Sequence, residues 1–149
     1  VQAIGAAHMG NGVENIAYLT LRYRSGLIVH LNCSWASPVK IRKMIIGGNK
    51  KMIIYDDIEP TDKLKIYDYG YSMITDEYRR NVLVDYRLGD VSIPKFSLRE
   101  ALSVMVEDFY NVVANNGTPL FTPQLSIDVT NTLIAADQSL KQDGQMVNL

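Results

Sequence analysis

The side chains that could hold a ligand gather just after a strand-like stretch that ends at Trp35. Lys40 and Arg42 follow Pro38 and stand two positions apart, a spacing that places both on one face of a strand. Two cations on one side of a sheet, beside the Trp35 indole, could bind an anionic or a hydroxylated ligand. The competing interpretation is a charged edge strand that resists aggregation. Trp35, Lys40 and Arg42 are therefore the candidate substrate-binding residues.

Three carboxylates follow shortly afterwards, at Asp56, Asp57 and Glu59. Such a group invites a metal-binding or acid–base interpretation. Carboxylates at the end of a strand more commonly form a solvated loop or pair with nearby cations, which here are Lys50, Lys51 and Lys63. We therefore expect no metal site at this position.

Other chemistry-bearing residues are few, with two histidines and one cysteine in the chain. His8 and His30 have no ligand-type partner at close spacing, although His30 could serve a site or an interface. Cys33 falls on the apolar face of a strand and is expected to be a small buried thiol. The run Tyr78-Arg79-Arg80 could be a ligand loop or an ordinary surface loop.

Signatures of catalysis and cofactor binding are missing from these residues. Gly10-Asn11-Gly12 lacks the third glycine and the strand–turn–helix context of a dinucleotide-binding loop. The sequence also shows no phosphate-binding loop and no G-x-S-x-G nucleophile motif. We expect no catalytic, cofactor-binding or metal-binding residue in this chain.

Composition limits the possible partners. The 149 residues are 47% hydrophobic and 21% charged with a net charge of −1, which is typical of a globular domain and gives no electrostatic case for nucleic acid. No apolar run approaches the roughly 20 residues of a membrane helix. The single cysteine suits a reducing, cytoplasmic location. The chain opens with Val1 inside a strand-like segment, so we expect it to be the C-terminal portion of a longer protein.

The elements that must position these residues begin with an antiparallel sheet. Residues 27–57 are expected to form three consecutive strands, because residues 27–35 alternate with a period of two and the 41–46 and 51–55 segments are β-rich. Gly47-Gly48-Asn49 is expected to make the hairpin turn with positive φ. An edge strand in residues 1–9 and a strand over 16–23 precede them, so that one meander continues through the sheet. Further strands are expected over 64–67 and 82–86.

The final third of the chain changes to helical spacing. Ser97 and Glu100 match a capping box, and Asn115-Asn116-Gly117 ends that first helix. Thr122-Pro123 begins a second helix that ends near Asp143-Gly144. Its expected apolar stripe consists of Leu125, Val129, Leu133, Ala136 and Leu140, and a last short strand is expected over 147–149. Strands first and helices afterwards indicate an α+β fold, with an open, mainly antiparallel sheet and two C-terminal helices packed on one face.

The other face of that sheet is unusually apolar for a solvated surface. Two helices cover only one face, and the second face carries Tyr18, Ile28, Ile53 and Tyr55 among polar residues. This leftover face is expected to be available for oligomerisation.

An ordered series of segments runs through nearly the whole chain: ENIAYLTLRYRSG (14–26), SWASPVKIRKMIIGGNKKMIIYDD (34–57), GDVSIP (89–94), LREAL (98–102), N-G-x-P (116–119) and ADQSLKQDGQMVNL (136–149). This series resembles the C-terminal domain of the glucose–fructose oxidoreductase / inositol dehydrogenase (Gfo/Idh/MocA) family. The resemblance implies a single substrate-binding and oligomerisation domain over residues 1–149. It also implies a sugar, nucleotide sugar or cyclitol as substrate and NAD or NADP as cofactor.

The resemblance also places the family's cofactor loop and catalytic lysine, aspartate and histidine upstream of Val1, so no catalytic residue is carried over and this fragment alone is expected to be inactive. It implies a homodimer or homotetramer formed through the sheet face. The alternative is a non-catalytic β-sheet module that assembles or regulates a partner.

Overall fold

The computed structural model describes residues 1–10, 12–68, 70–72, 85–87, 89–95 and 99–149. Tyr78-Arg79-Arg80 and most of the strand expected over 82–86 lie outside these residues. The chain divides into two compact units, one formed by Val1–Pro38 with Arg99–Leu149 and the other by Val39–Leu98.

The first unit is built on a three-stranded antiparallel sheet in the order β1-β2-β3. Its strands are β1 (Gln2–Ala6), β2 (Ile16–Arg22) and β3 (Ile28–Ser34). The expected edge position of the first strand is confirmed, and Gly26 turns the chain from β2 to β3 with a φ of 88°. That φ lies in the left-handed region, which glycine adopts without steric cost.

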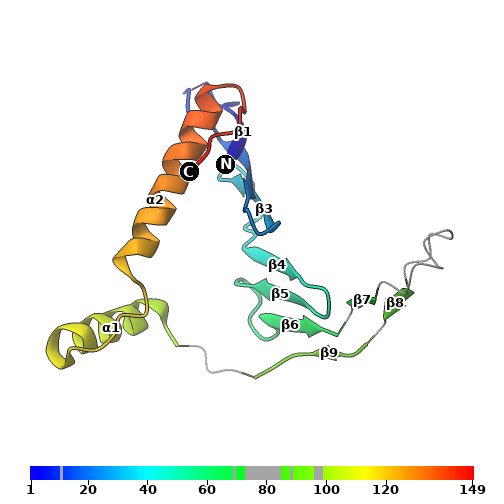
Figure 1. Ribbon diagram of the computed structural model, residues 1–149, viewed down its shortest axis with the longest axis vertical. Helices are drawn as coiled ribbons and strands as arrows, with labels where there is room; N and C mark the ends of the chain where they lie inside the picture. The colour runs from blue at the N-terminus through cyan, green and yellow to red at the C-terminus, as the bar shows by residue number, and fades with distance from the viewer. Residues whose placement is uncertain (11, 69, 73–84, 88, 96–98) are drawn as a thin grey trace. The chain divides into compact units, whose positions relative to one another are not determined.

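Two helices follow in the same unit, α1 (Ala101–Asn115) and α2 (Pro123–Lys141). The start of α2 is as expected, since Thr122 accepts a hydrogen bond from the Leu125 amide at 3.3 Å and Pro123 opens the first turn. The end of α1 is confirmed as well, because Asn116 adopts a left-handed φ of 51° at its C-cap. Figure 1 shows α2 alongside β1, with the two chain termini close together.

The capping box expected at the start of α1 is wrong in its position. Glu100 has an extended backbone and is itself the N-cap, and its carboxylate accepts from the Ser103 amide at 2.6 Å. The helix therefore begins three residues later than a Ser97 cap requires, and Ser97 lies outside the described residues. A carboxylate at the N-cap satisfies an amide that has no partner within the helix.

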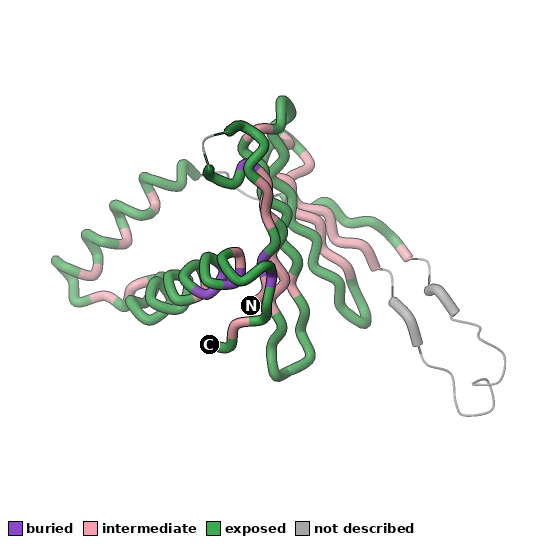
Figure 2. Tube along the Cα trace, turned by 90° about the horizontal axis from the view of Figure 1, so that it is seen from above, coloured by how far each residue is buried: buried purple, intermediate pink, exposed green. Residues whose placement is uncertain are grey.

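The tightest packing in the first unit lies between β1 and the C-terminal half of α2. Ala3, Ala135, Ala136 and Ser139 are all buried there, because small side chains let the helix approach the strand closely. Figure 2 shows these buried positions along α2 and the neighbouring strand. The expected apolar stripe of α2 is wrong in its N-terminal half: Ala136 is buried, whereas Leu125, Val129 and Leu133 are exposed.

Ser139 links the helix to both ends of the chain. Its hydroxyl is fully buried, accepts a hydrogen bond from the Ala3 amide at 2.9 Å and donates to the Gln145 carbonyl at 2.6 Å. Val147 then exchanges backbone hydrogen bonds with Val1 at 2.7 and 2.8 Å. Residues 147–149 do not form the expected short strand, although Val147 pairs with Val1 as a strand residue would.

The second unit contains a four-stranded antiparallel sheet in the order β4-β5-β6-β9 and a small β7-β8 pair. Its strands are β4 (Lys43–Gly47), β5 (Met52–Asp56), β6 (Leu64–Tyr67), β7 (Gly70–Ser72), β8 (Asp85–Arg87) and β9 (Val91–Ser92). The α+β class with antiparallel sheets is thus confirmed. The expected single meander differs from the described ladders, in which β3 and β4 belong to separate sheets.

The β4–β5 hairpin forms where the glycine pair predicted it, but by another geometry. The Gly48 amide donates to the Lys51 carbonyl at 3.0 Å. Gly47, Gly48 and Asn49 do not have positive φ. The prediction that positive φ makes this turn is therefore wrong, and a backbone hydrogen bond closes it instead.

Candidate functional site

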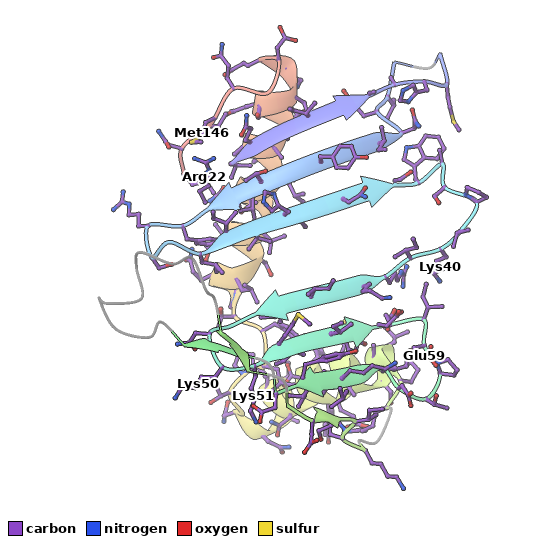
Figure 3. The ribbon with its side chains drawn as sticks, turned by 90° about the vertical axis from the view of Figure 1, so that its right-hand side faces the viewer. Arg22, Lys40, Lys50, Lys51, Glu59 and Met146 are labelled. Carbon is purple, nitrogen blue, oxygen red and sulfur yellow. The ribbon has the colours of Figure 1, made fainter. Side chains whose placement is uncertain are left out.

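A shallow hollow of about 380 Å³ lies in the second unit, where β4 begins and β5 ends. The residues that line it are Lys40, Ile41, Lys43, Asp56, Ile58, Glu59 and Pro60. Figure 3 shows Lys40 and Glu59 at this end of the β4–β5 hairpin, with Lys50 and Lys51 at the opposite end. The volume falls at the lower end of the 300–1,000 Å³ that is usual for small-molecule sites.

The hairpin register places the first ion pair of the site. Lys43 and Asp56 stand opposite each other on β4 and β5, and their side chains form an ion pair at 3.2 Å. The Lys43 ammonium lowers the pKa of Asp56, and the Ile58 amide, which donates to the same carboxylate at 3.2 Å, acts in the same direction. The Asp56 carboxylate at the end of β5 is therefore held in place, and its charge is neutralised by Lys43.

Asp57 is the centre of a second group of contacts. It accepts a hydrogen bond from the Tyr55 hydroxyl at 3.1 Å and forms ion pairs with Arg42 at 3.4 Å and Lys63 at 3.9 Å. The Tyr55 hydroxyl, followed by Arg42, lowers the pKa of Asp57, and the same hydrogen bond raises the pKa of Tyr55. The Asp57 amide also donates to the Arg42 carbonyl at 2.9 Å, which holds the two chain segments together just before β4 begins and just after β5 ends.

Two charged side chains of the hollow remain outside these pairs. Glu59 accepts a hydrogen bond from the Thr61 hydroxyl at 3.3 Å but forms no ion pair within the described residues. Lys40 makes neither an ion pair nor a side-chain hydrogen bond with the described part of the chain. The hollow thus offers one free ammonium donor and one carboxylate acceptor.

The three candidate substrate-binding residues belong to two different units, Trp35 to the first and Lys40 and Arg42 to the second. Lys40 lines the hollow, whereas Arg42 does not line it and is engaged by Asp57. Neither lies in a strand, because β4 begins at Lys43, so the argument that they share a strand face is wrong. Trp35 belongs to the other unit, is 61% exposed and donates its indole N–H to the Glu14 carbonyl at 2.9 Å.

The acidic residues behave mainly as partners for cations, but not for all the expected ones. Asp57 contacts Lys63 as expected, while Lys50 and Lys51 lie at the far end of the hairpin and the true partners are Lys43 and Arg42. Glu59 was noted only as one of three neighbouring carboxylates, and its place in the lining of the hollow was not predicted. Across the part of the chain that is described, carboxylate, imidazole and thiol groups form no cluster that could hold a metal ion.

The histidines and the cysteine belong to the first unit. Asn15 accepts from the His8 amide at 2.6 Å and lies 3.1 Å from its ring nitrogen, and the His30 ring lies 3.1 Å from the Thr20 hydroxyl. The expectation that Cys33 is buried is wrong, because its side chain is exposed. It lies on β3 at the edge of the sheet, while α2 packs against β1 at the opposite edge.

The described residues do not fit a dinucleotide cofactor. Gly10 and Gly12 both have positive φ, but they stand in the loop between β1 and β2 and lead into a strand, not into a helix. A pyrophosphate would need the amides of a helix N-terminus at that point. Gly10 and Gly12 are therefore not the glycines of a dinucleotide-binding loop.

Comparison with known proteins gives a match at the level of fold. The backbone is similar to two crystal structures of UDP-N-acetylglucosamine 3-dehydrogenase GnnA from Acidithiobacillus ferrooxidans, with TM-scores of 0.71 and 0.72 at 19% and 18% sequence identity. Each match covers 97% of this chain and 40% of the other, so the chain spans about two fifths of the length of those structures. No family model and no curated protein sequence matches the chain. Neither described helix has the length and apolar character needed to cross a bilayer.

Proposed function

We propose that this chain is the substrate-binding and assembly domain of an NAD(P)-dependent dehydrogenase that acts on a hydroxyl carbon of a nucleotide sugar or a related sugar or cyclitol. The observation that carries the proposal is the backbone match over 97% of the chain to part of a nucleotide-sugar dehydrogenase. The hollow beside Lys40 supports it, because four charged side chains and three apolar ones line it. The cofactor and the catalytic acid–base groups belong to other residues of the natural protein in this proposal.

The role of this chain in the reaction is to bind and orient the substrate. A dehydrogenase cofactor supplies the hydride chemistry, and the protein supplies position and electrostatics. Lys40 can donate to substrate oxygens and Glu59 can accept from substrate hydroxyls, as their side-chain chemistry allows. Trp35 remains a proposed substrate contact on the strength of its exposed indole.

Assembly is assigned to the face of the first unit's sheet that α2 does not cover. Ile4, Tyr18 and Ile28 lie on that face, opposite to buried Ala3, and are 59%, 52% and 55% exposed. Ile53 and Tyr55, which were expected on the same face, belong to β5 in the other unit. Such a patch is typical of an association surface. We expect a homodimer or homotetramer, and Tyr18→Glu should lower the mass measured by light scattering. Surface Lys50→Glu should not change that mass.

The test of the proposed function is a turnover assay on the natural protein that contains this chain. It is supplied with NAD or NADP and with nucleotide sugars, free sugars and cyclitols in turn, and reduction of the cofactor is followed by absorbance. We expect turnover with at least one nucleotide sugar. A protein that reduces neither cofactor with any of these substrates would instead favour the non-catalytic assembly module.

A further inference from the structure

The charges that line the hollow beside Lys40 are balanced. Lys40 and Lys43 contribute two cations, and Asp56 and Glu59 contribute two carboxylates. Lys43 and Asp56 neutralise each other at 3.2 Å, which leaves Lys40 and Glu59 to meet a ligand. A site for phosphate would show an excess of cations, since an anion gains from each of them and is repelled by each carboxylate.

The free groups fit a hydroxyl better than a phosphate. An ammonium group only donates and an ionised carboxylate only accepts, whereas a hydroxyl does both and can satisfy Lys40 and Glu59 together. A phosphate would satisfy Lys40 but would place its oxygens in the field of Glu59. Ile41, Ile58 and Pro60 add apolar surface against which the C–H groups of a ring can pack.

Size points in the same direction. The hollow measures about 380 Å³ and is open to solvent, which suits one ring and not a complete nucleotide sugar. We infer that this hollow binds the uncharged polyhydroxylated ring of the substrate, with Lys40 and Glu59 as specificity-determining residues, and that the phosphates are bound elsewhere. The inference rests on the proposed function for the identity of the substrate, but the binding chemistry can be tested without turnover.

The experiment measures direct binding to the natural protein by titration calorimetry, at low and at high salt. The neutral probe is methyl N-acetyl-β-glucosaminide and the charged probe is UDP. Lys40→Met and Glu59→Gln should each weaken the neutral probe by about tenfold or more, the range expected for losing a hydrogen bond to a charged group. Binding of UDP should be unchanged in both variants. Lys50→Met, at the other end of the hairpin, is the matched control and should leave both probes unchanged.

Salt dependence adds an independent readout. Binding of an uncharged probe should change little with ionic strength, because salt screens interactions between charges and this probe carries no charge. If Lys40→Met weakens UDP but not the glycoside, or if Glu59→Gln strengthens UDP, the hollow is a phosphate site and the inference is overturned. If neither variant changes either probe, or if the unmodified protein does not bind the glycoside, the hollow is not a ligand site. Turnover of a nucleotide sugar with unaffected binding in both variants would refute this inference while the proposed function stands.

Discussion

Ser139→Ala should destabilise the first unit far more than its small change in size suggests. The Ser139 hydroxyl is fully buried, and its removal leaves the Ala3 amide and the Gln145 carbonyl without the partners they have at 2.9 and 2.6 Å. A buried polar group without a partner costs about 1–3 kcal/mol. The Ala3 amide and the Gln145 carbonyl both lose a partner, but the carbonyl lies near the chain end and can reach water. We therefore expect a loss of about 2–3 kcal/mol in the free energy of unfolding.

Urea denaturation followed by circular dichroism measures this loss. With a slope of about 2 kcal/mol per molar urea, the midpoint should fall by about 1 M. Ser126→Ala is the matched control, because it makes the same change at an exposed position of the same helix and should shift stability by less than about 0.5 kcal/mol. If the two variants have the same midpoint, the buried hydroxyl does not hold β1 to α2 and our description of this contact is refuted.

Three further predictions concern single side chains. Asp57 has a lowered pKa, so its contribution to stability is present above its ordinary pKa of about 4 and is lost as the pH falls through the folded-state value. The urea midpoint of Asp57→Asn should therefore lie below that of the unmodified chain at pH 5–7. The difference between the two midpoints should shrink below about pH 4. A difference that stays constant down to pH 2 would contradict the ion pairs described for Asp57. Thr122→Ala should cost about 1 kcal/mol by urea denaturation because the Leu125 amide loses its cap, whereas Thr122→Ser should cost much less. Cys33 should react with a thiol reagent in the folded 149-residue chain at a rate close to that in urea, and strong protection would mean that its strand edge is covered.

Local chemistry made much of the fold predictable. Thr122-Pro123 and Asn116 marked a helix start and a helix end through rules that depend only on neighbouring residues, and both are confirmed. The period-two alternation located β2 and β3 in the same way. Two local rules failed in detail, the capping box before α1 and the positive φ of the β4–β5 turn. A third failure depends on a distant partner. The stripe of α2 was read from periodicity, but which turns are buried depends on where β1 ends, and only its C-terminal half is covered.

The candidate site was predictable only in part for a similar reason. Lys40 was selected from its type and its place after a proline, and it does line the hollow. Arg42 looked equivalent in sequence, yet the hairpin register brings Asp57 against it and uses its charge. Glu59 was considered only as one of three neighbouring carboxylates, because its place in the hollow depends on the path of the loop after β5. Spacing along a chain identifies neighbours on one strand, but it does not identify the ion pairs that a hairpin creates between strands.

The measurement that tests the account most directly is the initial rate of NAD(P) reduction by the natural protein when UDP-N-acetylglucosamine is added. The proposed function predicts a rate that depends on both cofactor and nucleotide sugar and saturates with each. No reduction with this or any related nucleotide sugar, from a protein shown to be folded and to bind the cofactor, would contradict the proposal that this chain is the substrate-binding domain of such a dehydrogenase.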